Sequence, residues 1–244
     1  MKKQILSGIL ILVISQNSFA QKNSSGKSEQ WLDSGLAKFE RGDYKGAISD
    51  LSKTIKKKPH NMEAYLVRDI CYRKLEKYDV VIEDVTMMLK KFPKNADLYY
   101  ARGYSHAALG NYTFAIKDYS KAILLNPDDA NLYYNRAIAY DELGKLCKAN
   151  EDFSLAIELN PNEPDFYYNR GIVYEEMKNM TEAIKDYSKV IELNPEDAEV
   201  YFSRAFLYAQ MNQFDDACTD LKKVMDMEYE PEEAEIIYES FCNK

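Results

Sequence analysis

The sequence predicts an all-α protein built from stacked helical hairpins, because one pattern of residues returns every 34 positions. The phrase NLYYNRA occupies residues 131–137, DFYYNRG occupies 165–171, and DLYYARG occupies 97–103. Self-similarity at a fixed period of this length indicates a solenoid in which each repeat is one supersecondary unit. Neighbouring units then cover each other's apolar faces.

Two further sets of residues define the repeat. An aromatic column with the same spacing comprises Trp31, Tyr65, Tyr99, Tyr133, Tyr167 and Tyr201. Five prolines close successive units: Pro59, Pro93, Pro127, Pro161 and Pro195. These columns divide residues 28–231 into six units, which are 28–61, 62–95, 96–129, 130–163, 164–197 and 198–231.

Each unit has the pattern of two helices joined by a turn. In the fourth unit, Tyr133, Ala137 and Tyr140 fall on one face of a helix. Gly144 suits a left-handed helix end, and a second apolar stripe follows over 146–156. A proline then ends the second helix because it cannot continue the hydrogen-bond ladder.

These residues resemble the tetratricopeptide repeat (TPR), a 34-residue unit with W-x2-L-G-x2-Y, then A-x3-F, then P. The fourth unit matches through Tyr133, Ala137, Tyr140, Ala149, Phe153, Ala156 and Pro161. The resemblance implies a right-handed superhelical solenoid of six helix-turn-helix repeats, with residues 232–244 as a C-terminal capping helix. The second unit departs most, since Asp69 and Val81 replace small crossing residues, and its hairpin is expected to be looser or differently angled.

The first residues have the pattern of a secretory signal peptide. Two lysines precede an apolar stretch over 5–14, and a small-x-small site lies at 18–20, ahead of Gln21. The apolar stretch is too short to span a bilayer comfortably. We therefore expect a signal peptide at 1–20, a flexible leader at 21–27, and export to the periplasm or beyond in a Gram-negative bacterium. An uncleaved N-terminal anchor is the alternative.

Composition and motifs argue against nucleic acid binding and catalysis. Residues 21–95 carry 16 Lys and Arg against 11 Asp and Glu, whereas residues 96–244 carry 14 against 29. An acidic chain of this kind lacks the basic footprint that phosphates require. The residues show no metal-ligand spacing, phosphate loop or nucleophile elbow. The sequence predicts no enzyme, no cofactor and no metal site.

A second aromatic register runs beside the first one. Four consecutive units carry a ring there, and the next turn adds two more, giving Tyr100, Tyr134, Tyr168, Phe202, Tyr104 and Phe206. In TPR proteins these first-helix positions line the concave groove that binds peptide segments, so the resemblance implies such a groove here. Its acidic fringe comprises Asp141, Glu142, Glu175 and Glu176, together with Asp97, Asp165 and Glu199. Partial burial against the neighbouring unit is the alternative, and Tyr133 is expected in the core.

Two charged columns predict a structural ladder. The arginines are Arg68, Arg102, Arg136, Arg170 and Arg204, and the acids are Asp50, Asp84, Asp118, Asp152 and Asp186. Arg136 follows Asp118 by 18 residues and precedes Asp152 by 16, so the spacing allows either partner. We expect Asp118, across the junction between units, which leaves Asp220 for the cap. A row of arginines that binds anions is the alternative.

Four cysteines allow a disulfide in an exported chain. Cys71 and Cys147 lie two units apart, too far for a bridge. Cys218 lies on the last second helix and Cys242 on the expected cap, so we predict one bridge between them. Two buried free thiols are the alternative.

The predicted function is a non-enzymatic scaffold that binds a segment of a partner protein in its groove. The alternative is a structural or self-assembling envelope component, which uses its convex face and termini. Opposite charge in the two parts of the chain would suit head-to-tail contact. The sequence leaves the partner and the oligomeric state open.

Overall fold

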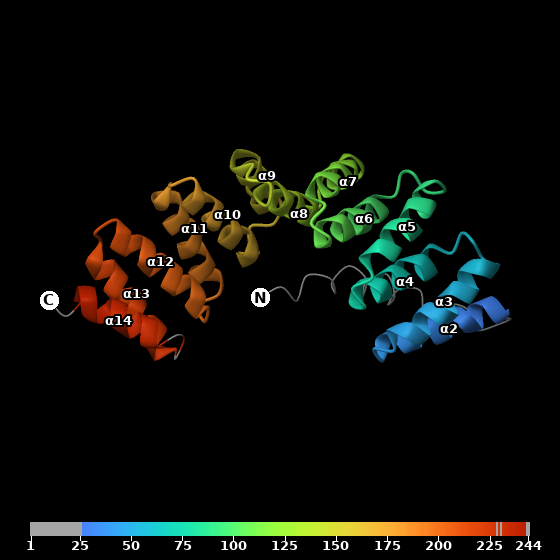
Figure 1. Cartoon of the computed structure of the whole chain (residues 1–244), viewed down its shortest axis with the longest axis horizontal. Helices are drawn as coiled ribbons and strands as arrows, with labels where there is room; N and C mark the ends of the chain where they lie inside the picture. Colours follow the sequence, from blue (N-terminus) through green and yellow to red (C-terminus); the bar gives the residue numbers. More distant parts are fainter. Residues whose placement is uncertain (1–25, 228, 230, 243–244) are drawn as a thin grey trace. The chain divides into compact units, whose positions relative to one another are not determined.

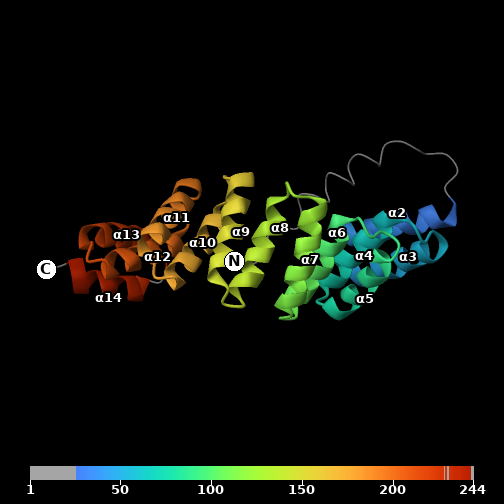
Figure 2. The same ribbon diagram turned by 90° about the horizontal axis from the view of Figure 1, so that it is seen from above.

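The computed structural model describes residues 26–227, 229 and 231–242, and every regular element within them is an α-helix. The predicted signal peptide and most of the predicted leader lie outside these residues. Thirteen helices follow one another in chain order in the described part (Figure 1), and Figure 2 shows them from above. The chain is thus an all-α helical repeat, as the period of 34 predicted.

Each predicted unit contains two helices. The first helices are α2 (Lys27–Glu40), α4 (Met62–Lys74), α6 (Ala96–Ala108), α8 (Ala130–Asp141), α10 (Pro164–Glu176) and α12 (Ala198–Gln210). The second helices are α3 (Tyr44–Lys57), α5 (Tyr78–Leu89), α7 (Tyr112–Leu125), α9 (Leu146–Leu159), α11 (Met180–Leu193) and α13 (Phe214–Asp226). The last helix is α14 (Pro231–Cys242).

The predicted leader is too long by one residue, because α2 already begins at Lys27. The backbone N–H of Gly26 donates to the Glu29 carboxylate at 3.1 Å. This contact satisfies a donor that a helix start otherwise leaves unpaired.

The chain divides into two compact units, one ending at Lys77 and the other beginning at Tyr78. The division falls within the second predicted repeat, between α4 and α5. In that repeat Asp69 occupies a position where other repeats have Gly or Ala. Asp69 is buried and forms an ion pair with Arg73, one turn later in α4, at 2.6 Å.

Small residues in the first helices make room for large ones in the second helices. A Cβ atom at Gly103 would lie 2.9 Å from the ring of Tyr119, and one at Gly171 would lie 2.6 Å from the ring of Tyr187. Both tyrosine rings are almost fully buried. Any side chain at these glycines would therefore force the two helices apart.

The turn between the two helices of a repeat always contains one left-handed residue. These residues, again 34 apart, are Gly42, Glu76, Gly110, Gly144, Lys178 and Asn212. Gly144 has a φ of +66°, which agrees with the helix end predicted there. Lys178 takes a φ of +60° despite its Cβ, so the hairpin geometry outweighs the local preference.

The charged ladder connects neighbouring repeats, but its partners differ from the prediction. Arg136 binds Asp152 with two hydrogen bonds, from Nε at 2.6 Å and from Nη2 at 2.8 Å. Its Nη1 donates to Ser120 Oγ of the preceding repeat at 2.9 Å. The expected partner Asp118 instead binds Arg102, at 2.7 Å. Arg136 pairs at the offset of 16 residues because Asp152 lies on α9, the second helix of the same hairpin.

The same arrangement recurs in the other repeats of the compact unit that begins at Tyr78. Arg102, Arg170 and Arg204 repeat it with Asp118, Asp186 and Asp220, and their serine or threonine partners are Thr86, Ser154 and Ser188. Asp220 therefore binds Arg204 rather than serving the cap, which corrects the prediction. The hydroxyl column also has a period of 34, and this signal in the sequence was missed.

In the compact unit that ends at Lys77, a serine and two lysines bind the aspartate in place of an arginine. The position 16 residues before Asp50 is Ser34, whose hydroxyl donates to Asp50 at 2.8 Å. Lys38 and Lys53 supply the positive charge, at 2.6 Å and 2.7 Å. These hydrogen bonds hold the pKa of Asp50 well below its usual range. Arg68 donates to Ser52 at 3.0 Å, as the other arginines do to their hydroxyl partners.

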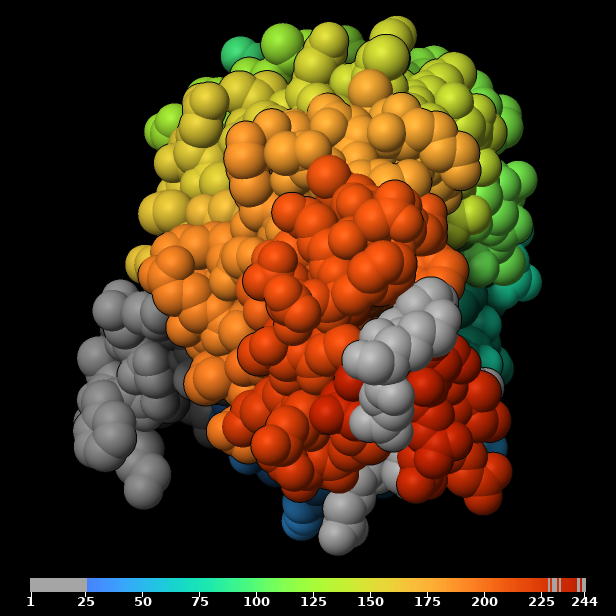
Figure 3. Space-filling view, turned by 90° about the vertical axis from the view of Figure 1, so that its left-hand side faces the viewer, coloured from blue at the N-terminus to red at the C-terminus, as the bar shows by residue number. Residues whose placement is uncertain are grey.

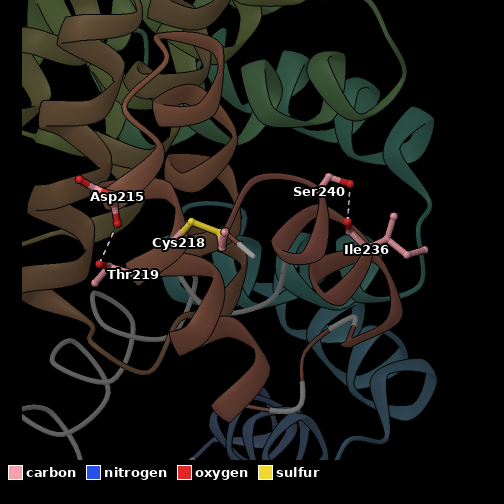
Figure 4. The surroundings of a disulfide bond; sticks show 6 residues. Asp215, Cys218, Thr219, Ile236 and Ser240 are labelled. Carbon is pink, nitrogen blue, oxygen red and sulfur yellow. Dashed lines mark hydrogen bonds between the residues drawn. A yellow bond between two sulfur atoms is a disulfide. The ribbon is translucent and has the colours of Figure 1, made fainter. Parts of the chain in front are cut away.

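The helix α14 covers the last hairpin, and Figure 3 views the molecule from the end at which α13 and α14 lie. The buried Ala234 of α14 packs with Leu221 and Val224 of α13. A disulfide joins Cys218 to Cys242, with a Cα–Cα distance of 5.8 Å (Figure 4). A loop closed over 24 positions restricts the unfolded chain, so the bridge favours the capped state. Cys71 and Cys147 are free thiols.

The ladder leads to a test of which carboxylate pairs with Arg136. Arg136→Ala is expected to lower the free energy of unfolding by about 3 kcal/mol, because it leaves a buried carboxylate unpaired. A double-mutant cycle with Asp152→Ala should show coupling of about 2 kcal/mol, whereas the cycle with Asp118→Ala should be additive within about 0.5 kcal/mol. Urea unfolding followed by circular dichroism measures both. Coupling to Asp118 instead of Asp152 would contradict the observed pairing.

Candidate functional site

The six predicted groove rings lie on the first helices α6, α8, α10 and α12, and they differ in exposure. Phe206 is 52% exposed, whereas Tyr134 is only 9% exposed. The other four are half-buried: Tyr100, Tyr104, Tyr168 and Phe202. Five of the six rings therefore reach the surface far enough to contact a partner.

Tyr134 is a core residue, which corrects its assignment to the groove. Its ring centroid lies 4.9 Å from that of Phe166 and 5.8 Å from that of Phe153. Its hydroxyl accepts a hydrogen bond from Asn169 at 3.1 Å. Tyr134 is buried because Phe166 of the next repeat is large enough to cover it. One repeat later, the residue equivalent to Phe166 is the smaller Val200, and Tyr168 is only half-buried.

Tyr133 is half-buried, although its register in the sequence predicts a core position. The guanidinium carbon of Arg136 lies 5.7 Å from the centre of its ring. Four more tyrosines of the first aromatic column have the same contact with their arginines: Tyr65, Tyr99, Tyr167 and Tyr201. This column therefore supports the ladder by cation–π contact.

Neighbouring tyrosines of α5, α6 and α7 form an aromatic cluster. The ring of Tyr104 lies 6.4 Å from both Tyr78 and Tyr100, and Tyr100 lies 6.1 Å from the buried Tyr119. Tyr78 was missed, because it is the first residue of a second helix and lies outside the register used for the prediction. The cluster anchors half-buried rings on a buried one, so they are held in place before any partner binds.

Carboxylates crowd at the N-terminal ends of the first helices. Six of them make up what we call the acidic row: Asp97, Asp129, Glu163, Asp165, Asp197 and Glu199. Burial raises the pKa of Asp97, and the charge of Asp129 raises it further. Burial likewise raises the pKa values of Glu163 and Asp197, each with a further contribution from neighbouring carboxylates. A nearby cation would relieve this repulsion.

The acidic row is continuous with the aromatic surface. The hydroxyl of Tyr168 donates to the Glu199 carboxylate at 2.9 Å. Asp129, Glu163 and Asp197 were not among the predicted residues, although they occupy the helix-start positions of successive repeats and share the period of 34. A column of acids at this position was the signal that could have identified them.

The predicted acids at the opposite helix ends have two different environments. Glu142 and Glu176 are exposed, whereas Glu175 accepts a hydrogen bond from the buried Tyr187. Asp141 occupies the position of Glu175 one repeat earlier, but Phe153 stands there in place of the tyrosine. Asp141 Oδ1 is accordingly buried without a hydrogen-bond partner. Burial, with the charges of Glu176 and Glu142, raises its pKa to about 6.

Across 26–227, 229 and 231–242, no three His, Cys, Asp or Glu side chains are grouped to hold a metal ion. His106 stacks on Phe114 with ring centroids 5.2 Å apart, and burial lowers its pKa. Within the same residues, no helix has the length and apolar character needed to cross a membrane.

Family models support the resemblance seen in the sequence. Tetratricopeptide repeat models match residues 164–197 and 187–219, and a TPR repeat model matches 103–144 and 139–178. No curated protein matches the chain.

Several solved structures have a similar fold. A tetratricopeptide repeat protein from Parabacteroides merdae is 24% identical, with a TM-score of 0.69 over 84% of this chain and 81% of that one. MamA is 27% identical, with a TM-score of 0.62 over 64% of this chain and 92% of that one. YrrB, described as a TPR protein with an unusual peptide-binding site, is 18% identical, with a TM-score of 0.65 over 78% and 97%.

The two adjacent tyrosines of α8 give a test of the corrected core. Tyr134→Ala is expected to cost about 3–5 kcal/mol of unfolding free energy, because it leaves a cavity beside Phe166. Tyr133→Ala should cost clearly less, since that ring is half-buried and its main contact is with Arg136. Denaturant unfolding of both variants measures the difference. A larger loss for Tyr133→Ala would restore the original assignment.

The raised pKa of Asp141 predicts a pH-dependent penalty on stability. Folding favours the protonated carboxyl, so this penalty is absent below about pH 4, grows as pH rises towards 6, and is complete above it. After allowance for solvent screening, Asp141→Asn should stabilise the chain by about 1–2 kcal/mol at pH 7 and by almost nothing at pH 4. Phe153→Tyr, which supplies a hydroxyl donor, should act in the same direction. Equal effects of Asp141→Asn at both pH values would contradict the assignment.

Proposed function

Because the chain is a tetratricopeptide-repeat protein, a fold that serves as a scaffold for protein–protein interaction, we propose that it binds a basic segment of a partner protein along its first helices. The observation that carries the proposal is the juxtaposition of half-buried rings with carboxylates that repel one another. The proposed role is non-enzymatic. Binding relieves the repulsion and covers the rings.

The proposed binding face uses the two kinds of contact that suit Lys and Arg side chains. The rings of Tyr100, Tyr104 and Tyr168 offer aromatic faces, over which a cation is attracted by about 0.5–2 kcal/mol. The acidic row supplies charge-assisted hydrogen bonds and steers the approach of a basic partner. YrrB, whose fold is similar, is described as having a peptide-binding site, which is compatible with this use of the fold.

We propose further that the chain is exported and acts in the cell envelope. The N-terminal pattern of lysines, apolar stretch and small-residue site supports export. The Cys218–Cys242 disulfide also fits an oxidising compartment. Fractionation of cells, with the N-terminal residue of the purified chain determined by mass spectrometry, tests both cleavage before Gln21 and location.

A site-specific photocrosslinker tests the binding face itself. Phe206 on α12 is 52% exposed, and Leu124 on α7 is 75% exposed. A crosslinker in place of Phe206 should capture a discrete partner in living cells, whereas one in place of Leu124 should not. Asp165→Lys with Glu199→Lys should abolish capture at Phe206, because these changes reverse the local charge. Capture from Leu124 alone would instead favour binding through the second helices.

A further inference from the structure

The helix α3, which is the second helix of the first repeat, carries an exposed stripe of lysines. Lys45, Lys53 and Lys56 fall on one face of α3, with Lys57 beside them, and all four are exposed. The only acid of this helix, Asp50, is buried and already bound to Lys38 and Lys53. We call these four residues the lysine stripe.

The lysine stripe differs from α9, α11 and α13, where charges of both signs are mixed, and from α7, which carries only two exposed lysines, Lys117 and Lys121. On α11, Lys185 pairs with Glu182 and Lys189 pairs with Glu192, each at 2.6 Å. No described carboxylate lies at ion-pair distance from Lys45, Lys56 or Lys57. A face of one sign, in which only Lys53 is paired, marks an interaction surface more strongly than a face of mixed charge does.

The acidic row offers a face of opposite sign on the same chain. Its carboxylates are crowded enough that neighbouring charges, together with burial, raise the pKa values of Asp97, Glu163 and Asp197. Asp97 and Asp165 are exposed, so a cation can reach the row. The row and the lysine stripe belong to different compact units.

We propose that the lysine stripe of one copy docks on the acidic row of a second copy, so that the chains associate head to tail. The contact joins two different surfaces, and each docked copy leaves one free surface of each kind. Such an interface is heterologous and extends into a ring or a filament. A second copy is favoured as the occupant because the chain itself carries both complementary faces.

This inference rests on the same acidic row as the proposed function and adds a consequence to it. A docked copy covers the face that a basic partner needs. Self-association and partner binding therefore exclude each other, and a sufficiently basic partner dissociates the assembly by competing for the acidic row. Both contacts weaken as salt screens their charges.

Sedimentation velocity of the chain from Gln21 onward tests the proposal. At low salt, about 20 mM, the sedimentation coefficient should rise with protein concentration, and at about 500 mM it should not. Lys45→Glu with Lys56→Glu and Lys57→Glu should abolish the rise, and so should Asp97→Lys with Asp165→Lys. The matched control is Lys117→Glu with Lys121→Glu on α7, which should leave association unchanged.

Mixing the two charge-reversed variants separates lost complementarity from lost folding. Each variant alone should be monomeric, but together they should associate, since the reversed stripe of one meets the reversed row of the other. Monomers at every concentration of the unaltered chain, or no association in the mixture, would overturn the proposal. A monomeric chain that still captures a partner through Phe206 would leave the proposed function standing.

Discussion

The interaction on which the repeat array depends is the bridge from an arginine to an aspartate and a hydroxyl, formed by Arg102, Arg136, Arg170 and Arg204. One guanidinium binds the carboxylate of its own hairpin through two nitrogens and the hydroxyl of the preceding repeat through the third. The planar fork of arginine suits this arrangement, and a lysine could not reproduce it. Each bridge thus fixes both the hairpin and its junction with the repeat before it.

The aromatic residues are organised around this bridge. The tyrosines of the first aromatic column stack against the arginines, so their rings shield the ion pairs, and all of these rings except the buried Tyr167 remain partly open to solvent. Because the ladder already connects the repeats, the second register is free to vary. Its rings range from the buried Tyr134 to the exposed Phe206. Differences among the rings of this register allow a repeat protein of this type to bind a particular partner.

The charges of the buried aspartates of the ladder are paired, whereas two charged surfaces remain without enough opposite charge of their own. The buried aspartates Asp118, Asp152 and Asp220 each bind an arginine. No arginine or lysine pairs with the acidic row among the described residues, and within the lysine stripe only Lys53 has a carboxylate partner, Asp50. Charges that remain unpaired at the surface contribute little to folding but strongly influence association. The lysine stripe lies in one compact unit and the acidic row in the other, so each unit carries a surface for partners of opposite charge.

The sequence by itself determined the repeat, its six units, the two helices in each unit and the turn at Gly144, because these follow from local spacing and backbone preference. It also contained the columns of arginine, aspartate and hydroxyl residues. Only the tertiary structure decided that Arg136 binds Asp152, since offsets of 16 and 18 residues are both compatible with a period of 34. It also decided that Tyr134 is buried, because this depends on Phe166 in the next repeat. Periodicity fixes which positions are equivalent, whereas the size of each neighbouring side chain decides which equivalent position is open to a partner.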